Sequence, residues 1–369
     1  MHTLYQKYIF TPGPVKMYKE TLELGAMQTP YFRNEEFSQV VLDCETNLLQ
    51  IANAPKNSRV LFLTASGTAG MEATVQNLLS LKDTALIING GGFGQRFVDI
   101  CNIHGITNIN CKVKDTNLSD TSLLNDSKDA SSLIVNAHET SIGVLYNLES
   151  LGNFAKENNM LFIVDAISMF ITDALDMSRD NIDALIISSH KGLALPPALS
   201  MIILSPKAIA KINPKHQLYF DFNSYLKDGL RGQTPFTPAV SVILQLQKRL
   251  EQIIKNTPQK EIQKAKEIAH YFREAIKPLP LKPYTHFMPN ALTTLTPTDN
   301  KSALEIVKAL EEKYNVVVAP NGGELKDTIF RVSHMGDMTK EYTDILIDAL
   351  FDYYGSKNRK ICRDKCRSS

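Results

Sequence analysis

Short apolar runs alternate with amphipathic stretches over the first two thirds of the chain. The runs are rich in Ile, Leu and Val and show little polar alternation, which is typical of strands buried on both faces of a parallel sheet. The sequence therefore predicts strands at residues 60–64, 84–89, 132–137, 160–166, 184–189 and 200–205.

Helical periodicity fills the intervals between these strands. In residues 37–51, apolar side chains such as Phe37 and Leu48 recur at the spacing of one helix face. Further helices are predicted at 68–81 and 149–158. Repeated strand–helix–strand units predict an α/β fold, because a helix must cross between parallel neighbouring strands.

The pattern changes near Asp221. Residues 217–240 are rich in aromatic residues, Gly and Pro, and we interpret them as loops. The remaining pattern predicts helices at 241–256, 259–277, 302–314 and 339–354, with strands at 291–296, 315–320 and 328–334. We therefore expect a large domain over 1–245, which includes an N-terminal arm, and a small α+β domain over 246–355.

Composition restricts the partners and the compartment. Basic and acidic residues number 40 and 39, so the chain has no overall field for nucleic acid or for an anionic membrane. No apolar run has the length of a membrane span or of a signal peptide. Five scattered cysteines argue against a disulfide framework. We expect a cytoplasmic protein that holds any anionic ligand at a local site.

Residues 356–369 form a basic tail that we expect to be disordered. The tail contains Cys362 and Cys366, four positions apart. No histidine or second cysteine pair accompanies them, so the sequence predicts no metal site there.

Polar residues follow several predicted strands, at the edge where open α/β sheets bind ligands. The segment Ala65-Ser66-Gly67-Thr68-Ala69-Gly70 follows the first strand and opens a helix. Backbone N–H groups at a helix start, beside two hydroxyls, form a suitable site for an anion. An ordinary capping turn, however, has the same kind of residues.

Two further strands end in charged residues. Asp165 ends one buried strand, where a carboxylate is costly without a cationic or donor partner, although it could equally cap a loop. Lys191 follows another strand, in the sequence His190-Lys191-Gly192. Burial readily lowers the pKa of a lysine and makes it a nucleophile for carbonyl groups, although most loop lysines are solvated.

The three features together match one cofactor. An anion cradle suits a phosphate, a carboxylate suits a pyridinium nitrogen, and a lysine suits an aldehyde. These are the three groups by which proteins hold pyridoxal 5′-phosphate. The sequence therefore predicts that Lys191 carries this cofactor as a Schiff base and that Asp165 faces its ring nitrogen.

A series of motifs supports this interpretation. In chain order they are TPGP (11–14), RNEEF (33–37), SGTAGMEA (66–73), NGGGFGQR (89–96), HETSIGVL (138–145), VDAIS (164–168), SSHKGLALPP (188–197), TPFTPAV (234–240) and FRVSHMG (330–336). Through them the chain resembles the class V aminotransferases of fold type I, in the alanine/serine–glyoxylate aminotransferase branch. The resemblance runs from about Phe10 to Tyr354. It implies a large domain with a mostly parallel sheet and a smaller C-terminal α+β domain.

The resemblance implies specific contacts to the cofactor phosphate. Ser66, Gly67 and Thr68 would hold it at the start of a helix. His190 would lie beside it, at a position where this branch often has Gln.

The resemblance also implies contacts to the cofactor ring. Phe93 would stack on one face of the ring and Ile167 would pack on the other. Thr140 would donate a hydrogen bond near the ring hydroxyl. Asp165 would pair with the ring nitrogen.

A homodimer is implied as well. Thr237, in the loop 231–240, would reach the phosphate in the partner subunit. Thr234, where the branch often has Tyr, is the other candidate for this contact. Arg331 would bind the α-carboxylate of the substrate, and an ion pair with Asp337 or Glu341 is the alternative role for this arginine.

The implied reaction is ping-pong transfer of an amino group from a small amino acid of the alanine or serine class. The acceptor would be a 2-oxo acid of the glyoxylate or pyruvate class. A 2-aminoethylphosphonate–pyruvate aminotransferase is an alternative. A cysteine desulfurase would need a mobile cysteine in residues 318–330, which contain none. A non-catalytic scaffold is disfavoured by the presence of Lys191 and Asp165.

Overall fold

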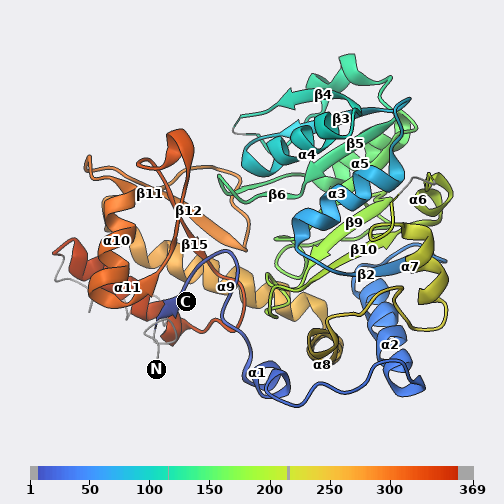
Figure 1. The fold of residues 1–369 in the computed structure, drawn as a ribbon. Helices are drawn as coiled ribbons and strands as arrows, with labels where there is room; N and C mark the ends of the chain where they lie inside the picture. Colours follow the sequence, from blue (N-terminus) through green and yellow to red (C-terminus); the bar gives the residue numbers. More distant parts are fainter. Residues whose placement is uncertain (1–6, 115, 214–216, 356–369) are drawn as a thin grey trace.

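The computed structural model describes residues 7–114, 116–213 and 217–355, and the structural statements below concern these residues. Figure 1 shows a larger lobe built on a seven-stranded sheet and a smaller lobe built around a four-stranded sheet. The α/β fold expected from the sequence is thereby confirmed. Within the described ranges, no helix combines the length and apolarity that crossing a membrane requires.

The large sheet has the strand order β2-β10-β9-β8-β5-β3-β4. Its strands are β2 (Arg59–Thr64), β3 (Thr84–Asn89), β4 (Thr107–Lys112), β5 (Ser132–Asn136), β8 (Leu161–Asp165), β9 (Ala184–Ser188) and β10 (Leu199–Leu204). Neighbouring strands are parallel except at β10, which runs antiparallel to both β9 and β2. The six predicted strands are confirmed, whereas β4 was not predicted.

Helices cover both faces of this sheet. Along β2, Val60 and Phe62 face one core and Leu61 and Leu63 face the other. The first core is closed by α2 (Glu35–Ile51), α5 (Leu148–Glu157) and α8 (Val240–Asn256). The second is closed by α3 (Gly67–Leu78), α4 (Gly92–Ile103), α6 (Pro206–Lys211) and α7 (Phe222–Gly229). The large lobe also contains α1 (Lys19–Gly25) and a 3₁₀ helix, η2 (Ser122–Ser127). Burial on both faces explains the continuous apolar runs of the strands.

The interpretation of residues 217–240 as loops alone is wrong, because α7 forms inside this segment. The Asp221 side chain accepts hydrogen bonds from the backbone N–H groups of Asn223 and Ser224, at 3.3 and 3.1 Å, and so caps the helix. Phe222 and Tyr225 are buried in the core beneath it. A good cap and two buried aromatic rings stabilise a helix too short to show a clear period.

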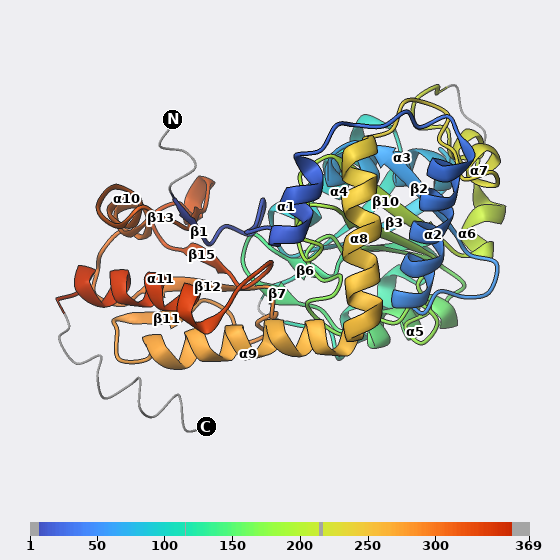
Figure 2. The ribbon, with the colours of Figure 1, turned by 90° about the horizontal axis from the view of Figure 1, so that it is seen from below.

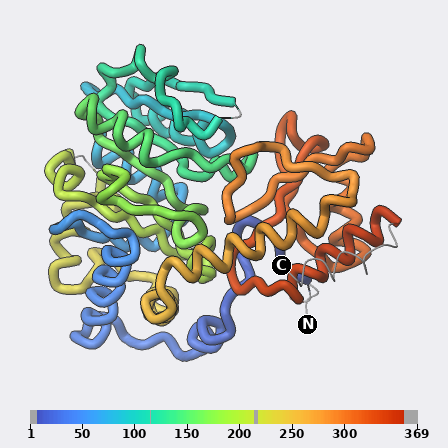
Figure 3. The backbone as a smooth tube through the Cα atoms, turned by 180° about the vertical axis from the view of Figure 1, so that it is seen from behind, coloured from blue at the N-terminus to red at the C-terminus, as the bar shows by residue number. Residues whose placement is uncertain are grey.

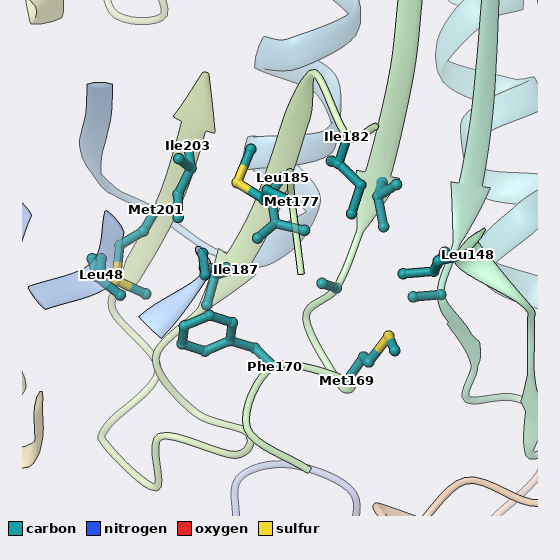
Figure 4. Packing of buried hydrophobic residues seen from close by; sticks show 14 of the residues in the cluster. Leu48, Leu148, Met169, Phe170, Met177, Ile182, Leu185, Ile187, Met201 and Ile203 are labelled. Atoms are coloured by element: carbon teal, nitrogen blue, oxygen red, sulfur yellow. The ribbon is translucent and has the colours of Figure 1, made fainter. Parts of the chain in front are cut away.

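The segment that follows β8 is part of the core. Figure 4 shows Met169, Phe170 and Met177 among the packed side chains, together with Ile187 from β9 and Met201 from β10. The packing holds the chain on the carboxyl side of Asp165 in place.

The small lobe is built on an antiparallel sheet with the order β11-β12-β15-β14. Its elements are α9 (Pro258–Ile276), β11 (Leu281–Pro283), β12 (Leu292–Pro297), α10 (Ala303–Tyr314), β13 (Val316–Val317), β14 (Ala319–Pro320), η3 (Gly323–Leu325), β15 (Phe330–Ser333) and α11 (Lys340–Tyr353). The N-terminal strand β1 (Tyr8–Ile9) pairs with β13, and Phe10 is buried in the core of this lobe.

The expected boundary after residue 245 falls within α8, and the tail 356–369 lies outside the described residues.

A sharp bend between α8 and α9 connects the lobes, as Figures 2 and 3 show. Arg249 of α8 is 2% exposed and donates hydrogen bonds to both carboxylate oxygens of Glu261 in α9, at 2.6 and 3.3 Å. Its guanidinium also lies 4.1 Å from the centre of the Tyr18 ring. The ion pair therefore fixes the bend and the N-terminal arm together.

We predict that Glu261→Gln lowers the free energy of unfolding by about 3 kcal/mol, because it leaves a buried guanidinium without a counter-charge. Urea unfolding measures this difference. Glu267→Gln, on the exposed face of the same helix, is the matched control and should change stability by less than about 0.5 kcal/mol. Equal losses in the two variants would contradict the assigned role of the pair.

Candidate active site

The candidate site lies at the carboxyl ends of β2, β8 and β9, where three chain segments are in contact. A Cβ added to Gly67, the first residue of α3, would lie only 2.5 Å from Cδ1 of Ile167. The same Cβ would lie 3.4 Å from Cβ of Ser188, at the end of β9. The start of α3 therefore packs directly against the segments that carry Asp165 and Lys191, and glycine at position 67 permits this approach.

The start of α3 offers donors and no negative charge. The Ser66 side chain caps the helix by accepting from the N–H of Ala69, at 3.4 Å. The N–H groups of Gly67 and Thr68 belong to the first turn, where a helix has no internal acceptor. The Thr68 hydroxyl accepts a hydrogen bond from Nη1 of Arg96, at 2.9 Å. The first turn contains no acidic residue, so the segment is suited to an external anion.

Asp165 is a buried carboxylate whose desolvation is partly offset by hydrogen bonds. One oxygen accepts from the backbone N–H of Ile167 at 2.8 Å, and the other accepts from Nδ2 of Asn136 at 2.5 Å. Burial raises the pKa of Asp165 to about 6, against the lowering effect of these bonds and of Lys191. The carboxylate is ionised at pH 7, and each oxygen retains a lone pair for a further cationic donor.

Lys191 is buried without a partner. Its side chain is 9% exposed, and its ammonium makes no hydrogen bond or ion pair within the described part of the chain. Burial lowers the pKa of Lys191 to about 8, and the charges of Arg331 and Arg96 act in the same direction, whereas Asp165 opposes them. About one tenth of such a lysine is the neutral, nucleophilic amine at pH 7.

Two neighbours define the surroundings of the lysine. A Cβ at Gly13 would lie 2.9 Å from both Cδ and Cε of Lys191, so the N-terminal TPGP segment packs on the lysine stem. His190 shares a hydrogen bond of 2.9 Å between its Nδ1 atom and the Ser188 hydroxyl. Burial, followed by the charge of Lys191, lowers the pKa of His190 to about 4. The imidazole is therefore neutral at pH 7 and brings hydrogen bonding, not charge, to the site.

Glu139 positions the loop that carries Phe93. The side chain of Glu139 is buried, and its two oxygens accept hydrogen bonds from the N–H groups of Phe93 at 3.2 Å and Gly94 at 2.9 Å. Both N–H groups belong to the first turn of α4, so the carboxylate neutralises that helix start. The Arg96 guanidinium lies 4.8 Å from the centre of the Phe93 ring.

Thr140 and Arg331 connect the two lobes. β6 (His138–Glu139) and β7 (Val144–Leu145) form a hairpin, and Thr140 lies in its turn. The buried Thr140 hydroxyl lies 2.9 Å from that of Ser168. Arg331 of β15 donates from Nη1 to the Thr140 carbonyl at 3.3 Å and from Nη2 to the Pro320 carbonyl at 2.8 Å. The bond to Thr140 joins the guanidinium to the large lobe, and the bond to Pro320 holds it to the small lobe.

The guanidinium of Arg331 is not neutralised by an acidic residue. Its Nε atom is buried without a hydrogen-bond partner, and no salt bridge joins Arg331 to Asp337 or Glu341 in the described chain. Asp337 instead pairs with Lys16 and Lys264. Burial lowers the pKa of Arg331 from its usual value, and the charge of Glu139 opposes this effect. The arginine retains donors for an anionic ligand.

The two threonines of the loop before α8 have different environments. Thr237 is exposed. Thr234 is buried, and its hydroxyl donates to the Phe236 carbonyl at 2.6 Å. Arg33, from the RNEEF motif, donates to the Thr234 carbonyl at 2.8 Å. Thr237 is thus the one of the pair whose hydroxyl is available to another molecule.

A cavity of about 960 Å³ opens beside this site, between the glycine loop before α4 and the small lobe. Its walls include Gly91, Ser141 and Asn321, and Nδ2 of Asn321 donates to the Ser141 carbonyl at 2.9 Å. Neither Lys191 nor Asp165 lines this cavity, so it is separate from these two side chains. Within the described ranges, no group of three or more His, Cys, Asp or Glu side chains forms a potential metal site.

The structure brings the strand-end segments singled out from the sequence to one sheet edge, and it adds neighbours that the sequence analysis did not assign. Asn136 lies at the end of a predicted strand and Glu139 follows it, so the rule that singled out Asp165 and Lys191 could also have singled out these two. Gly13 and Arg96 stand in the motifs TPGP and NGGGFGQR but received no role from the sequence, because their contacts with Lys191 and Thr68 join distant parts of the chain.

The same overall fold occurs in known aminotransferases. The chain superimposes on the crystal structure of an alanine–glyoxylate aminotransferase from Nostoc sp. with a TM-score of 0.86, over 94% of each chain, at 23% identity. This likeness confirms the expected α/β architecture of fold type I.

Sequence comparison defines the family. Residues 18–324 match the model of the family "Aminotransferase class-V". An "uncharacterized aminotransferase" of Helicobacter pylori is 32% identical over 337 residues, which are 89% of this chain and 88% of that protein. The chain belongs to the aminotransferase class-V family. A rabbit alanine–glyoxylate aminotransferase is 24% identical over 363 residues, 93% of this chain and 91% of the relative, in keeping with the branch that the motifs resemble.

The buried lysine should cost stability while no ligand compensates it. Lowering the pKa from 10.5 to about 8 corresponds to a penalty of about 3 kcal/mol at pH 7. We predict that Lys191→Met increases the free energy of unfolding of the cofactor-free protein at pH 7 by an amount of this order. The advantage should shrink as the pH rises from about 8 towards 10.5, because over that interval the folded lysine is neutral while the unfolded lysine still binds a proton that becomes easier to remove.

Urea unfolding at a series of pH values measures this effect, with Lys82→Met at an exposed position as the control. An advantage of Lys191→Met that grows with pH would contradict the assigned lysine environment.

Proposed function

We propose that the chain is a pyridoxal-phosphate-dependent aminotransferase that acts on small substrates. The amino group would pass from an amino acid of the alanine or serine class to a 2-oxo acid of the glyoxylate or pyruvate class. The observation that carries this proposal is the convergence of the α3 start, Asp165 and the unpartnered Lys191 at one sheet edge. Relatives named as alanine–glyoxylate aminotransferases support the substrate class.

The residues present fit the phosphate end of this cofactor. Ser66, Gly67 and Thr68 would hold the phosphate with a hydroxyl and the N–H groups of the helix start. His190, which is neutral, would contribute a hydrogen bond there. Thr237 would reach the phosphate of a second copy of the chain.

The residues also fit the ring. Asp165 would accept a hydrogen bond from the protonated ring nitrogen, and Phe93 and Ile167 would flank the ring faces. Thr140, whose hydroxyl is close to that of Ser168, would lie beside the ring hydroxyl. When bound, pyridoxal phosphate supplies an electrophilic carbonyl carbon and a conjugated ring that can accept an electron pair.

Two side chains would perform the proton chemistry. The neutral form of Lys191 would take the proton from the substrate Cα, because its lowered pKa leaves the amine partly free of its own proton at pH 7. Asp165, ionised above about pH 6, would keep a proton on the nitrogen that it faces. Acidification below this value would remove that charge and lower the rate.

Arg331 would orient the substrate. A planar guanidinium matches a carboxylate by two parallel hydrogen bonds, and both the amino acid and the oxo acid carry this group. Its two existing bonds go to backbone carbonyl oxygens, which hold its position without neutralising its charge. Fixing the carboxylate also fixes the direction of the Cα–H bond.

The active protein would be a two-fold homodimer in the cytoplasm. Thr237 is exposed beside a groove of about 470 Å³ formed by residues 29–32 and 237–242. In a two-fold dimer, the exposed Thr237 hydroxyl of each copy would enter the phosphate site of the other copy. Each copy would thereby complete the site of its partner. The described cysteines Cys44, Cys101 and Cys111 are free, as in a reducing compartment.

A desulfurase is not favoured by the described cysteines. Burial raises the pKa of the thiols of Cys44, Cys101 and Cys111, which keeps them protonated and poorly nucleophilic. Residues 318–330 contain no cysteine.

We predict that borohydride reduction of the cofactor-loaded protein attaches the cofactor to Lys191, and that Lys191→Ala abolishes both the adduct and transamination, the latter by at least about a thousandfold. Peptide mapping locates the adduct, and a screen of amino donors against oxo acids measures turnover. Lys82→Ala is the control and should match the wild type. An adduct on another lysine in Lys191→Ala would disprove the assignment.

We predict that Arg331→Lys raises the Michaelis constants for alanine and for glyoxylate together, each by roughly 10- to 100-fold, because a point charge replaces a bidentate fork. Steady-state kinetics with both substrates measures the change. Arg179→Lys, at the amino end of β9, is the control. Unchanged constants in Arg331→Lys would refute the carboxylate role, and turnover of 2-aminoethylphosphonate in place of amino acids would favour the phosphonate alternative.

A further inference from the structure

Arg96 is a cation without an acidic partner. Its Nη1 atom donates to the Thr68 hydroxyl at 2.9 Å, and no salt bridge to Arg96 is formed within the described ranges. The side chain is only partly exposed. A half-buried guanidinium usually has an anion beside it, because desolvation of an unpaired charge is costly.

The surroundings of Arg96 add further positive potential. The start of α3 contributes the positive end of a helix dipole, and its first turn has no acidic residue. Lys191 is close enough for Arg96 to lower its pKa, although burial and Arg331 have larger effects. His190 is neutral at pH 7 and does not balance these charges. The carboxylates of Asp165 and Glu139 accept backbone and amide hydrogen bonds, and neither forms a salt bridge with Arg96 in the described ranges. The side of Thr68 therefore has an excess of positive charge.

We infer that Arg96 is the counter-ion of the cofactor phosphate, with one guanidinium edge on the Thr68 hydroxyl and the remaining N–H groups turned to the phosphate oxygens. The inference rests on the proposed function and adds a charge to a cradle otherwise made of hydroxyl and amide donors. A guanidinium suits a phosphate because its donors form two parallel hydrogen bonds. Arg96 acts in binding, and the proton chemistry remains with Lys191.

Arg96 also couples the phosphate to the stacking aromatic. Its guanidinium lies 4.8 Å from the centre of the Phe93 ring, within the range of a cation–π interaction. The two residues lie one turn apart on α4, whose start is held by Glu139. Phosphate binding would fix the Arg96 side chain, and the fixed guanidinium would in turn restrict the motion of the Phe93 ring.

The experiment compares two ligands that differ by the phosphate alone. Cofactor-free protein is equilibrated with pyridoxal 5′-phosphate or with pyridoxal, and dialysis measures the dissociation constants. Arg96→Met should weaken binding of pyridoxal 5′-phosphate by about 10- to 100-fold and change binding of pyridoxal by less than about twofold. Arg96→Lys should recover part of the loss, since it retains the charge without the planar fork.

Added salt and inorganic phosphate provide a second measurement. Inorganic phosphate should compete with pyridoxal 5′-phosphate on the wild-type protein and compete less on Arg96→Met. Raising the potassium chloride concentration should weaken wild-type binding more steeply than binding to the variant. Arg96→Gln, which keeps a donor for Thr68, replaces Arg96→Met if the latter does not fold. Lys82→Met controls for the loss of one positive charge at the surface.

The possible outcomes are distinguishable. Equally weakened binding of both ligands to Arg96→Met would show that Arg96 only supports the fold of the loop. Unchanged binding of pyridoxal 5′-phosphate would show that Arg96 has no role at the phosphate. Either result overturns the inference while the proposed function stands. Failure of the wild type to bind either ligand would overturn the proposed function as well.

Discussion

The burial of Lys191 without a compensating anion is the constraint on which the rest of the site depends. Arg331 and Arg96 add positive charge around it, and Asp165 supplies the negative charge that acts on the lysine, whereas the Glu139 carboxylate acts on Arg331. A site with this imbalance is costly in an empty protein and favourable with a dianionic ligand. The surrounding core, which holds the chain after β8 in place, stabilises an arrangement that would otherwise relax.

The sequence predicted those parts of the fold that are buried on both sides. Six strands were found because their apolar runs are continuous, and β4 was missed because its residues TNINCK lie mostly exposed at the sheet edge. Helix α7 was missed because it is short and depends on Asp221 and on two aromatic rings that contact the core only in the folded chain. Local pattern carries no information about such tertiary contacts.

The residues of the candidate site likewise divide into those that the sequence pattern could predict and those that depend on tertiary contacts. Ser66, Asp165 and Lys191 were predictable because each follows a strand of one sheet, and the carboxyl ends of parallel strands meet. Arg96 stands in the motif NGGGFGQR, but its contact was not predictable from periodicity, since it occupies an ordinary helical position and meets Thr68 through the packing of α4 beside α3. The contact between Gly13 and Lys191 likewise depends on the course of the N-terminal arm, which returns to the large lobe after pairing with the small one.

The antiparallel direction of β10 has a consequence for the dynamics of the lysine. Because β10 reverses direction next to β9, Lys191 lies on a short connection whose two ends are both hydrogen-bonded into the middle of the sheet, with no crossover helix between them. Within the connection, the N–H groups of Ala194 and Leu195 donate to the carbonyl oxygens of Lys191 and Ser189, so a large displacement of the lysine backbone would break these bonds. The amine of Lys191 is therefore carried by a segment that is anchored to the sheet at both ends and has little freedom to shift.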